Sequence, residues 1–330
     1  MILAGDIGGT KTRLAVFPAG GSLHEPLQEA VFASNGYSSL EDMVQEFLTQ
    51  TGCDVEKACF GVAGPVTGGQ AKMTNLPWRL DKDCLREALG FKSVHLINDL
   101  MATAAAVPHL AKEAILTLQE GKVDPAGNRA VIAPGTGLGE AFMVRNGEQW
   151  QACATEGGHT DYAPRSDEER NLWQFLRGMQ DHVSYETVCS GPGIALIYRH
   201  LREVFPNEGF PDLREALSGA ADPTPLIVAR AMPAGDPCPL CVKTLRFFAS
   251  ILGAEAGNLA LKVLATGGIY IGGGIPLRML PFLKEEGFLR SFVEKGRMSN
   301  LMKTIPVRVI LEPRAPLLGA AHWLSERERN

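Results

Sequence analysis

Two periods of hydrophobicity alternate through the first third of the chain. Leu40–Leu48 and Asp83–Leu89 place apolar residues at the spacing of amphipathic helices, and the alanine-rich segment Asp99–Val107 also predicts a helix. Between these segments, the short apolar runs Cys59–Ala63 and Val94–Ile97 predict buried strands. Strands that alternate with helices form partly parallel sheets covered by helices. The pattern therefore predicts an α/β arrangement.

The remaining two thirds of the chain are richer in helical patterns. Pro108–Asp124 is interpreted as a loop-rich bridge, and Ser166 with Glu169 forms a capping-box pattern. Helices are predicted over Ser166–Met179, Ile194–Phe205, Asp236–Leu264 and Pro316–Arg327, and strands over Ile269–Ile271 and Val307–Leu311. Gly253 and Gly257 lie in the longest of these helices and indicate close packing against another helix.

Glycine-rich turns that contain a hydroxyl residue occur twice. Gly5-Asp6-Ile7-Gly8-Gly9-Thr10 and Gly135-Thr136-Gly137-Leu138-Gly139 each lie between two apolar runs, which predicts a strand, a tight turn and a second strand. Glycine permits positive φ and lets backbone N–H groups approach an anion, and Thr10 and Thr136 each add a hydroxyl donor. Two such turns that face each other would hold a polyphosphate across a cleft between two related halves.

These turns differ from two better known phosphate motifs. A P-loop has Lys-Ser/Thr after its last glycine and a helix next, and a dinucleotide-binding motif also opens a helix. The competing interpretation is that both are ordinary hairpin turns. Asp6 within the first turn, and the pairing of the two turns, favour phosphate binding.

Asn98 and Asp99 lie where a predicted strand ends and a predicted helix begins. Ligands of α/β sheets gather at the carboxyl ends of strands. A carboxylate in such a place could accept a proton from a hydroxyl nucleophile. The alternative is helix capping, because Asn and Asp are among the best N-cap residues. The two roles are compatible for adjacent residues.

A polar loop with paired glycines follows the second hairpin. Glu156 and His159 lie three residues apart in it, so both could face one ligand, and hydrogen bonding to a polyol is the favoured interpretation. A solvated loop is the alternative. A zinc site is disfavoured because only Cys153 is near. Glu186, taken alone, is interpreted as a surface acid.

Composition narrows the class of protein. The chain has 330 residues, enough for two domains, and its apolar content of 45% and charged content of 21% are ordinary for a globular protein. The net charge of −5 argues against a nucleic-acid partner. No apolar run approaches the ~20 residues of a membrane span, and Asp6 interrupts any signal peptide. The seven cysteines are therefore expected to be reduced thiols in the cytoplasm, with Cys238 and Cys241 packing at a helix N-terminus.

Taken in order, the motifs resemble those of the bacterial glucokinase family of enterobacterial type, within the actin-like ATPase or sugar kinase superfamily. The matching stretches are Gly5–Thr10, Phe60–Pro65, Thr74–Trp78, Leu96–Asp99, Pro134–Gly139, Glu156–Pro164, Ser190–Gly193, Gly268–Gly274 and Gly287–Arg297. They run nearly end to end. The segment Asp161–Arg165 has no cysteine, which favours this family over the related repressor/open-reading-frame/kinase family and its zinc motif.

The resemblance implies a fold and an assembly. The fold is the two-domain actin-like ATPase (sugar kinase) fold of the α/β class, with a cleft between a smaller α/β domain and a larger α+β domain. The smaller domain would comprise residues 1–109 and 303–330, and the larger one residues 110–302. The resemblance also implies a homodimer.

The resemblance further implies ATP-dependent phosphorylation of glucose to glucose 6-phosphate, with Mg²⁺. Asp99 resembles the general base, and the glucose-contacting residues would be Asn98, Asp99, Glu156, His159 and Glu186. The nucleotide-binding residues would be Gly5, Asp6, Ile7, Gly8, Gly9, Thr10, Gly135, Thr136 and Gly137 for phosphate, and Gly272, Gly273 and Gly274 for adenosine. Asp6 would orient Mg²⁺ through water.

Three other functions compete with this one. A kinase for another hexose, such as mannose or an N-acetylated aminosugar, differs by the stereochemistry or substitution of the sugar. A non-catalytic sugar sensor is disfavoured because Asp99 is present and because the first hairpin begins too early to leave room for a DNA-binding segment. An actin-like ATPase that acts on proteins is disfavoured by the Glu156–His159 loop and the Asn98-Asp99 pair.

Overall fold

The computed structural model describes residues 1–73, 76–232 and 237–327. Thr74 and Asn75 of one matching motif, and the first residue of the predicted helix Asp236–Leu264, lie outside the described residues. The chain divides into a first unit, made of Met1–Ile115, Ala141–Ala154 and Glu312–Asn330, and a second unit, made of Leu116–Glu140 and Thr155–Leu311. The domain boundaries that the resemblance implies stay a prediction.

A five-stranded sheet forms the centre of the first unit. Its order is β3-β2-β1-β4-β8, with bounds β1 (Ile2–Ile7), β2 (Lys11–Phe17), β3 (Gln28–Ala33), β4 (Lys57–Val62) and β8 (Ser93–Asn98). The first three strands pair in antiparallel fashion, whereas β4 runs parallel to both β1 and β8. The predicted partly parallel sheet is confirmed.

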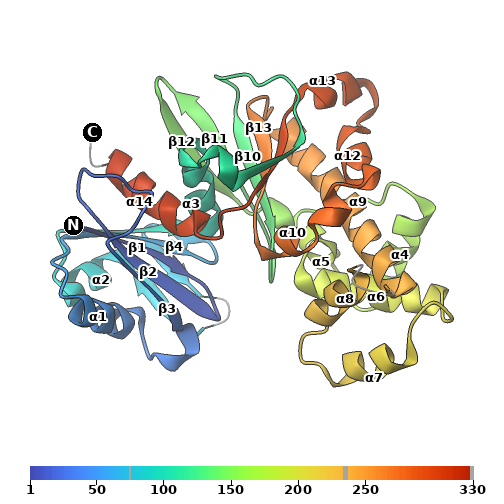
Figure 1. The fold of residues 1–330 in the computed structure, drawn as a ribbon, viewed down its shortest axis with the longest axis horizontal. Helices are drawn as coiled ribbons and strands as arrows, with labels where there is room; N and C mark the ends of the chain where they lie inside the picture. The colour runs from blue at the N-terminus through green and yellow to red at the C-terminus, as the bar shows by residue number, and fades with distance from the viewer. Residues whose placement is uncertain (74–75, 233–236, 328–330) are drawn as a thin grey trace. The chain divides into compact units, whose positions relative to one another are not determined.

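Helices cover both faces of this sheet because its residues alternate between two apolar clusters. Leu3 and Leu14 pack with α1 (Leu40–Thr51) and α2 (Lys82–Leu89). Their sequence neighbours, such as Ala4 and Ala15, point to the other face, toward α3 (Asp99–Ala106) and α14 (Ala315–Arg327). Figure 1 shows α1 and α14 on opposite faces of the sheet.

Helix α14, the last helix of the described residues, packs closely on α3 in the first unit. Gly319 makes this approach possible, since a Cβ at this position would lie 1.7 Å from the backbone oxygen of Ala102. α14 also contacts β1, β2 and β4, so its apolar residues complete one face of the sheet. A small antiparallel sheet of β5 (Val66–Thr67), β6 (Gln70–Lys72) and β7 (Arg79–Asp81) follows β4.

A six-stranded sheet has the order β12-β11-β10-β13-β14-β9, with bounds β9 (Ile115–Gln119), β10 (Arg129–Pro134), β11 (Leu138–Asn146), β12 (Gln149–Thr155), β13 (Gly268–Ile271) and β14 (Val307–Ile310). The interpretation of Pro108–Asp124 as a loop-rich bridge was wrong for β9. The partner strand of β9 is β14, which comes from the far end of the sequence, so no local pattern predicts β9. The Gln119 amide strengthens this edge by donating to the backbone oxygens of Met302 and Ile305, at 2.9 and 2.7 Å.

Helices make up most of the second unit. Their bounds are α4 (Asp167–Arg177), α5 (Tyr185–Val188), α6 (Gly191–Val204), α7 (Pro211–Gly219), α8 (Thr224–Ala231), α9 (Pro239–Lys262), α10 (Gly274–Arg278), α11 (Leu280–Leu283), α12 (Glu286–Val293) and α13 (Ser299–Thr304). The long helix α9 packs against α12, and a Cβ at Gly253 would lie 2.2 Å from the backbone oxygen of Phe288. The predicted close packing is confirmed. Cys238 and Cys241 are buried at the N-terminus of α9, as predicted.

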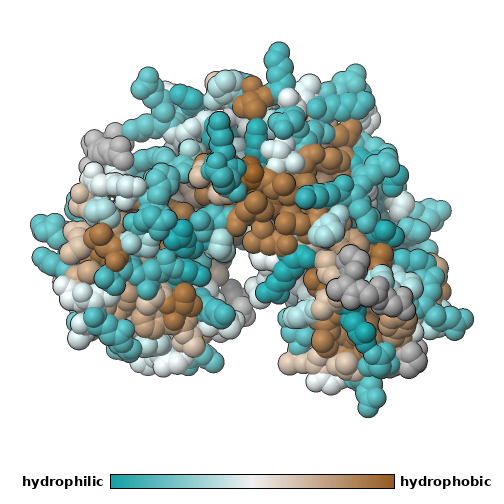
Figure 2. Space-filling model, viewed as in Figure 1, coloured by the Kyte–Doolittle hydropathy of each residue, from teal (hydrophilic) through white to brown (hydrophobic). Residues whose placement is uncertain are grey.

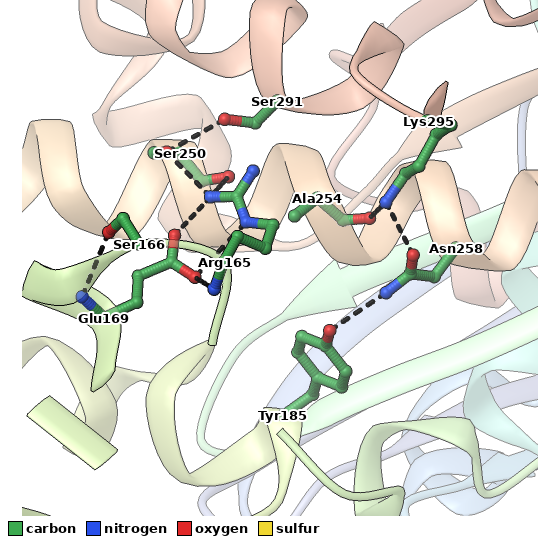
Figure 3. Close-up of polar contacts among 9 residues, drawn as sticks. All are labelled: Arg165, Ser166, Glu169, Tyr185, Ser250, Ala254, Asn258, Ser291 and Lys295. Carbon is green, nitrogen blue, oxygen red and sulfur yellow. Dashed lines mark hydrogen bonds and ion pairs between the residues drawn. The ribbon is translucent and has the colours of Figure 1, made fainter. Parts of the chain in front are cut away.

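Only one of the two hydrogen bonds of the capping box predicted for α4 is formed. Ser166 Oγ accepts a hydrogen bond from the backbone N–H of Glu169 at 3.2 Å. The Glu169 carboxylate does not return the contact to Ser166. It accepts instead from the backbone N–H of Arg165 at 2.9 Å, and it forms an ion pair with the Arg165 guanidinium (Figure 3). A buried acid and a nearby arginine thus take the place of the second half of the box.

The drawn face of the molecule is mostly hydrophilic, with apolar residues gathered in smaller patches (Figure 2). Among the helices of the described residues, none is both long enough and apolar enough to cross a membrane. Short 3-10 turns complete the fold at Ser34–Gly36, Val107–His109, Lys112–Ala114, Gly157–His159 and Gly296–Met298.

Candidate active site

The first glycine-rich motif is shorter as a turn than predicted. Gly5, Asp6 and Ile7 lie inside strand β1 and pair with both β2 and β4, so the turn consists of Gly8–Thr10 alone. The backbone N–H of Gly8 donates to the backbone oxygen of Lys11 at 3.1 Å, which closes the hairpin. The motif is therefore a strand end that carries Asp6, followed by a tight turn.

Asp6 lies opposite Arg13 in the β1–β2 pairing. Burial raises the pKa of the Asp6 carboxyl to about 6, and the nearby Arg13 opposes this shift. Arg13 also forms an ion pair with Glu29, so its charge is shared between two acids. Asp6 is therefore a carboxylate whose negative charge is only partly compensated by the protein, and an added cation beside it would favour the charged form.

Asn98 and Asp99 divide the roles that the sequence left open. Asn98 is the N-cap of α3, because its Oδ1 accepts from the backbone N–H groups of Leu100 and Met101 at 2.9 and 3.1 Å. Its Nδ2 donates to the backbone oxygen of Gly64 at 3.1 Å. Asp99 is the first residue of the helix and is partly exposed. The capping interpretation thus applies mainly to Asn98, while Asp99 Oδ1 accepts from the same Leu100 N–H at 2.9 Å.

The parallel strands of the first unit end at one edge of the sheet. Ile7 pairs with Val62, and Val62 pairs with Asn98, so the carboxyl ends of β1, β4 and β8 are level. Gly61 allows β4 to approach α3, since a Cβ there would lie 3.1 Å from the Cβ of Ala102. The first turn and Asp99 consequently share the edge at which α/β sheets bind ligands.

In the second unit, the structure brings Glu156, His159 and Glu186 together. The His159 Nε2 atom lies 4.0 Å from Glu156 Oε2, and its Nδ1 atom lies 3.8 Å from Glu186 Oε1. Glu186 Oε2 accepts a hydrogen bond from the backbone N–H of Leu138 at 2.8 Å. Glu186 is therefore tied to the second glycine turn, and its interpretation as a solitary surface acid was wrong.

The loop that carries Glu156 and His159 lies directly on the second hairpin. A Cβ at Gly158 would lie 2.1 Å from the backbone oxygen of Leu138, and one at Gly157 would lie 2.0 Å from Glu140 Oε2. Paired glycines are needed here because no side chain fits between the loop and strand β11. Both exposed side chains of the loop thus project from a backbone that is held in place.

Close approach, and not positive φ, explains Gly8 in the first turn and Gly137 in the second, whereas a Cβ at Gly135 would meet nothing within 4 Å. The expected positive φ is absent at Gly8, Gly135 and Gly137. A Cβ at Gly8 would lie 2.8 Å from the backbone oxygen of Lys11, and one at Gly137 would lie 2.4 Å from Glu186 Oε2. At the second turn, the requirement for glycine comes from a distant segment of the chain.

A pocket of about 900 Å³ opens beside the second turn. Gly135, Thr136 and Gly274 line it together with residues of α6 and α8. The backbone N–H of Gly191 donates to the backbone oxygen of Gly135 at 2.8 Å, which ties α6 to the turn. The walls of the pocket are mainly apolar, and they include the three basic side chains Arg199, Arg202 and Arg278. Apolar walls with a few basic groups suit a base and its phosphates.

The third glycine group borders the same turn. The backbone N–H of Gly272 donates to the backbone oxygen of Ile132 at 2.9 Å. Gly273 has a φ of +91°, and a Cβ there would lie 2.7 Å from the backbone oxygen of Pro134. This position requires glycine on both grounds. The third glycine group therefore lies against the strand that leads into the second turn, and Gly274 lines the pocket together with Gly135 and Thr136.

Comparisons with known proteins agree over nearly the whole chain. A sequence model described as Glucokinase matches residues 3–327. The chain belongs to the glucokinase family. A glucokinase of Nostoc punctiforme is 40% identical over 97% of this chain and 98% of its own length, and one of Yersinia pestis is 36% identical over 98% and 96%.

The fold also agrees with membership of the glucokinase family. A crystal structure of a glucokinase from an Antarctic psychrotroph covers 98% of each chain with a TM-score of 0.81 and 34% identity. The actin-like sugar kinase fold that the resemblance implied is thereby confirmed. Within this glucokinase-family chain, Gly5–Thr10, Asn98 and Asp99 belong to the first unit, and the other predicted site residues belong to the second.

Two functional candidates escaped the sequence analysis. Glu140 and Glu255 are acids with 1% and 0% exposure, and Glu140 lies beneath the Glu156–His159 loop. A signal was present for Glu255, which interrupts the predicted apolar helix Asp236–Leu264 with a charge, whereas Glu140 lies just after the second glycine turn. Among the described residues, no group of three or more His, Cys, Asp or Glu side chains is arranged to hold a metal ion.

Proposed function

We propose that this chain transfers the γ-phosphoryl group of ATP to the 6-hydroxyl of glucose, in keeping with its membership of the glucokinase family. The observation that carries the proposal is the hydrogen bond between Glu186 and Leu138. It joins an acid suited to binding sugar hydroxyls to a glycine turn suited to binding phosphate. Sugar and nucleotide recognition therefore depend on one connected structure.

Asp99 acts as the general base in this proposal. Its carboxylate accepts the proton of the 6-hydroxyl while the sugar oxygen bonds to the γ-phosphorus, and the bond from phosphorus to the bridging oxygen breaks with its electron pair moving to ADP. Asn98 caps α3 and so fixes the backbone from which Asp99 projects. Glu156, His159 and Glu186 bind hydroxyl groups of the sugar.

The residues present fit a magnesium ion. Mg²⁺ usually retains several waters and binds through one or two carboxylates plus substrate phosphates, so the single acid Asp6 suffices. The partly compensated charge of Asp6 favours a cation nearby. Bound Mg²⁺ would neutralise charge on the phosphate oxygens. The protein's own part is to hold the Asp6 carboxylate at the end of β1, beside the first turn.

Nucleotide binding is assigned to the pocket beside the second turn. Gly135, Thr136 and Gly137 would contact the phosphates, and Gly272–Gly274 the adenosine, with the apolar wall of α6 and α8 beside the base. The homodimer that the resemblance implies and the cytoplasmic location expected from the sequence stay part of this proposal. All seven cysteines are free thiols, which suits a reducing compartment.

A coupled assay of phosphorylation tests the proposal. Glucose, mannose and N-acetylated aminosugars are compared as acceptors, with ATP as donor and Mg²⁺ present. Glucose should give the highest kcat/KM, and chelation of Mg²⁺ should abolish turnover until the ion is restored. Preference for mannose or an aminosugar would instead select the alternative hexose kinase. Binding of glucose without turnover would favour the sugar sensor.

A further inference from the structure

Glu140 is a buried acid directly beneath the loop proposed to bind glucose. It is the third residue of β11 and has 1% exposure. Its Oε2 atom occupies the space that a Cβ of residue 157 would need, 2.0 Å away, so it supports Gly157 from below. Its Oε1 atom has no hydrogen-bond partner within residues 1–73, 76–232 and 237–327. A buried oxygen without a partner indicates that this carboxyl is not held as an ordinary ion pair.

A second buried acid, Glu255, contributes to the raised pKa of Glu140. Glu255 on α9 has 0% exposure, and its carboxylate accepts from Lys262 Nζ at 3.1 Å and from Asn258 Nδ2 at 2.7 Å. Lys262 therefore compensates the charge of Glu255, and no cation among the described residues forms an ion pair with Glu140. Burial and the charge of Glu255 raise the pKa of Glu140 to about 8, against a lowering by Lys262. Both effects favour the protonated form of Glu140.

The same buried network continues to the other glucose acid. Asn258 Nδ2 also donates to the hydroxyl of Tyr185 at 2.9 Å, and Lys295 Nζ donates to Asn258 Oδ1 at 2.5 Å (Figure 3). Tyr185 directly precedes Glu186, and its backbone N–H donates to the backbone oxygen of Thr160 at 3.0 Å. Both segments that bind glucose in the proposed function therefore rest on this network.

We propose that Glu140, in its protonated form, is a positioning residue for glucose binding: its carboxyl donates to the Glu255 carboxylate and supports Gly157, and loss of its proton weakens glucose binding. This inference rests on the proposed function. A second negative charge beneath Gly157 would repel Glu255 in a buried space, and the loop above would move to admit water. Glu156 and His159 would then lose their arrangement, while the base Asp99 belongs to the other unit.

Other titratable groups lie around Glu140, and their titration must be distinguished from that of Glu140. They are Glu255 and Lys262 on α9, Cys189 after α5, Tyr185 on α5, Lys295 after α12, Arg165 and Glu169 at the start of α4, and Glu156 and His159 in the loop above. Burial, followed by the charge of Arg165, lowers the pKa of Lys295 to about 8. Lys295 therefore titrates in the same range as Glu140, and the experiment needs a variant of each.

The test measures KM for glucose and kcat across the alkaline range. If only the protonated form of Glu140 binds glucose well, KM of the parent enzyme should rise about tenfold from about pH 7 to about pH 9, whereas kcat should change much less. Glu140→Gln keeps the size and the neutral state, so its KM should stay near the parental neutral value across this range. Glu140→Met is a second neutral variant in case the amide packs poorly. Glu168→Gln, on the exposed surface of α4, is the matched control and should keep the parental rise.

Several outcomes would overturn the inference. A flat parental KM, or an undiminished rise in well-folded Glu140→Gln and Glu140→Met, would remove Glu140 from this role. A rise that disappears in Lys295→Gln but persists in Glu140→Gln would assign the titration to Lys295. Failure of the parent to phosphorylate glucose at neutral pH would instead contradict the proposed function, so the two failures are distinguishable. Thermal unfolding of each variant checks that it is folded.

Discussion

The two units hold their candidate site residues in different ways. In the first unit, Asp6 and Asp99 stand where parallel strands end, and the backbone of the sheet fixes each of them separately. In the second unit, Glu156 and His159 lie in a loop with a 3-10 turn and Glu186 lies on the short helix α5, and the three are placed by contacts with one another and with the second turn. We infer from this difference that each first-unit residue acts alone, Asp99 in catalysis and Asp6 in charge compensation. The second-unit residues instead act together in binding glucose.

The largest expected effect is on kcat, and it tests whether a first-unit residue acts alone in catalysis. Asp99→Asn should fold and bind glucose, but kcat should fall by roughly 10²–10⁴-fold because the base is lost. Steady-state kinetics measure the effect. The unfolding temperature should stay near that of the parent, since Asn98 supplies the cap of α3.

Asn98→Ala is the matched control for Asp99→Asn. Loss of the cap should lower the free energy of unfolding by about 0.5–2 kcal/mol, which a denaturant titration measures. A parental kcat in well-folded Asp99→Asn would remove Asp99 from the catalytic role. It would also break the proposed contrast between the two units.

The next effect concerns glucose binding in the second unit. Glu156→Ala should weaken glucose binding by about 1.5–3 kcal/mol, because a hydrogen bond to a charged group is lost. Calorimetric titration with glucose and with ATP measures both affinities, and ATP affinity should change little. Equal losses for the two ligands would indicate damage to the fold.

A smaller effect tests whether second-unit residues act together. Glu156→Ala and Glu186→Ala should show a coupling of ~0.5–3 kcal/mol in glucose binding, since both side chains contact His159. The effects of Glu156→Ala and Asp99→Asn on kcat/KM should instead add. Additivity within the second unit would show that its residues act independently, contrary to the comparison.

The smallest effect concerns Asp6, whose pKa is raised from 3.8 to about 6. Between these values the folded protein binds more protons than the unfolded chain, so stability falls as pH rises through this window and is level above it. Asp6→Asn removes this dependence, so its unfolding temperature should gain a few degrees on the parent from about pH 4 to about pH 6. Scanning calorimetry measures the difference. Parallel curves for the two proteins would contradict a buried, titrating Asp6, and Mg²⁺ with ATP should stabilise the parent more than the variant.

Local patterns were sufficient for several elements whose partners are close in sequence, although β3 and β12, which pair with β2 and β11, were not predicted. The hairpins β1–β2 and β10–β11 and the helices α1, α2 and α3 were predicted because turn chemistry and periodicity act over a few residues. Strand β9 was missed because its partner β14 lies far along the chain. No helix was predicted over α7 or α8, so these two elements were missed as well.

The candidate site shows the same limit in its side chains. Glu186 was taken for a surface acid because its partner Leu138 is remote in sequence. The glycine at 137 was attributed to backbone conformation, whereas it makes room for that same carboxylate. Such requirements arise only when distant segments meet. The gathering of Glu156, His159 and Glu186 was expected from the family resemblance and not from any spacing.

The position of α14 has a consequence for how the chain is made. This helix is 13 residues long and ends the described chain, yet it covers one apolar face of the sheet that begins at Ile2. During synthesis, β1, β4 and α3 emerge early and must wait for almost the entire remaining chain before that face is covered. Domains usually fold as units from the N-terminus onward during translation, and an uncovered apolar face is prone to aggregate. We therefore expect the nascent first unit to be prone to aggregation until α14 leaves the ribosome.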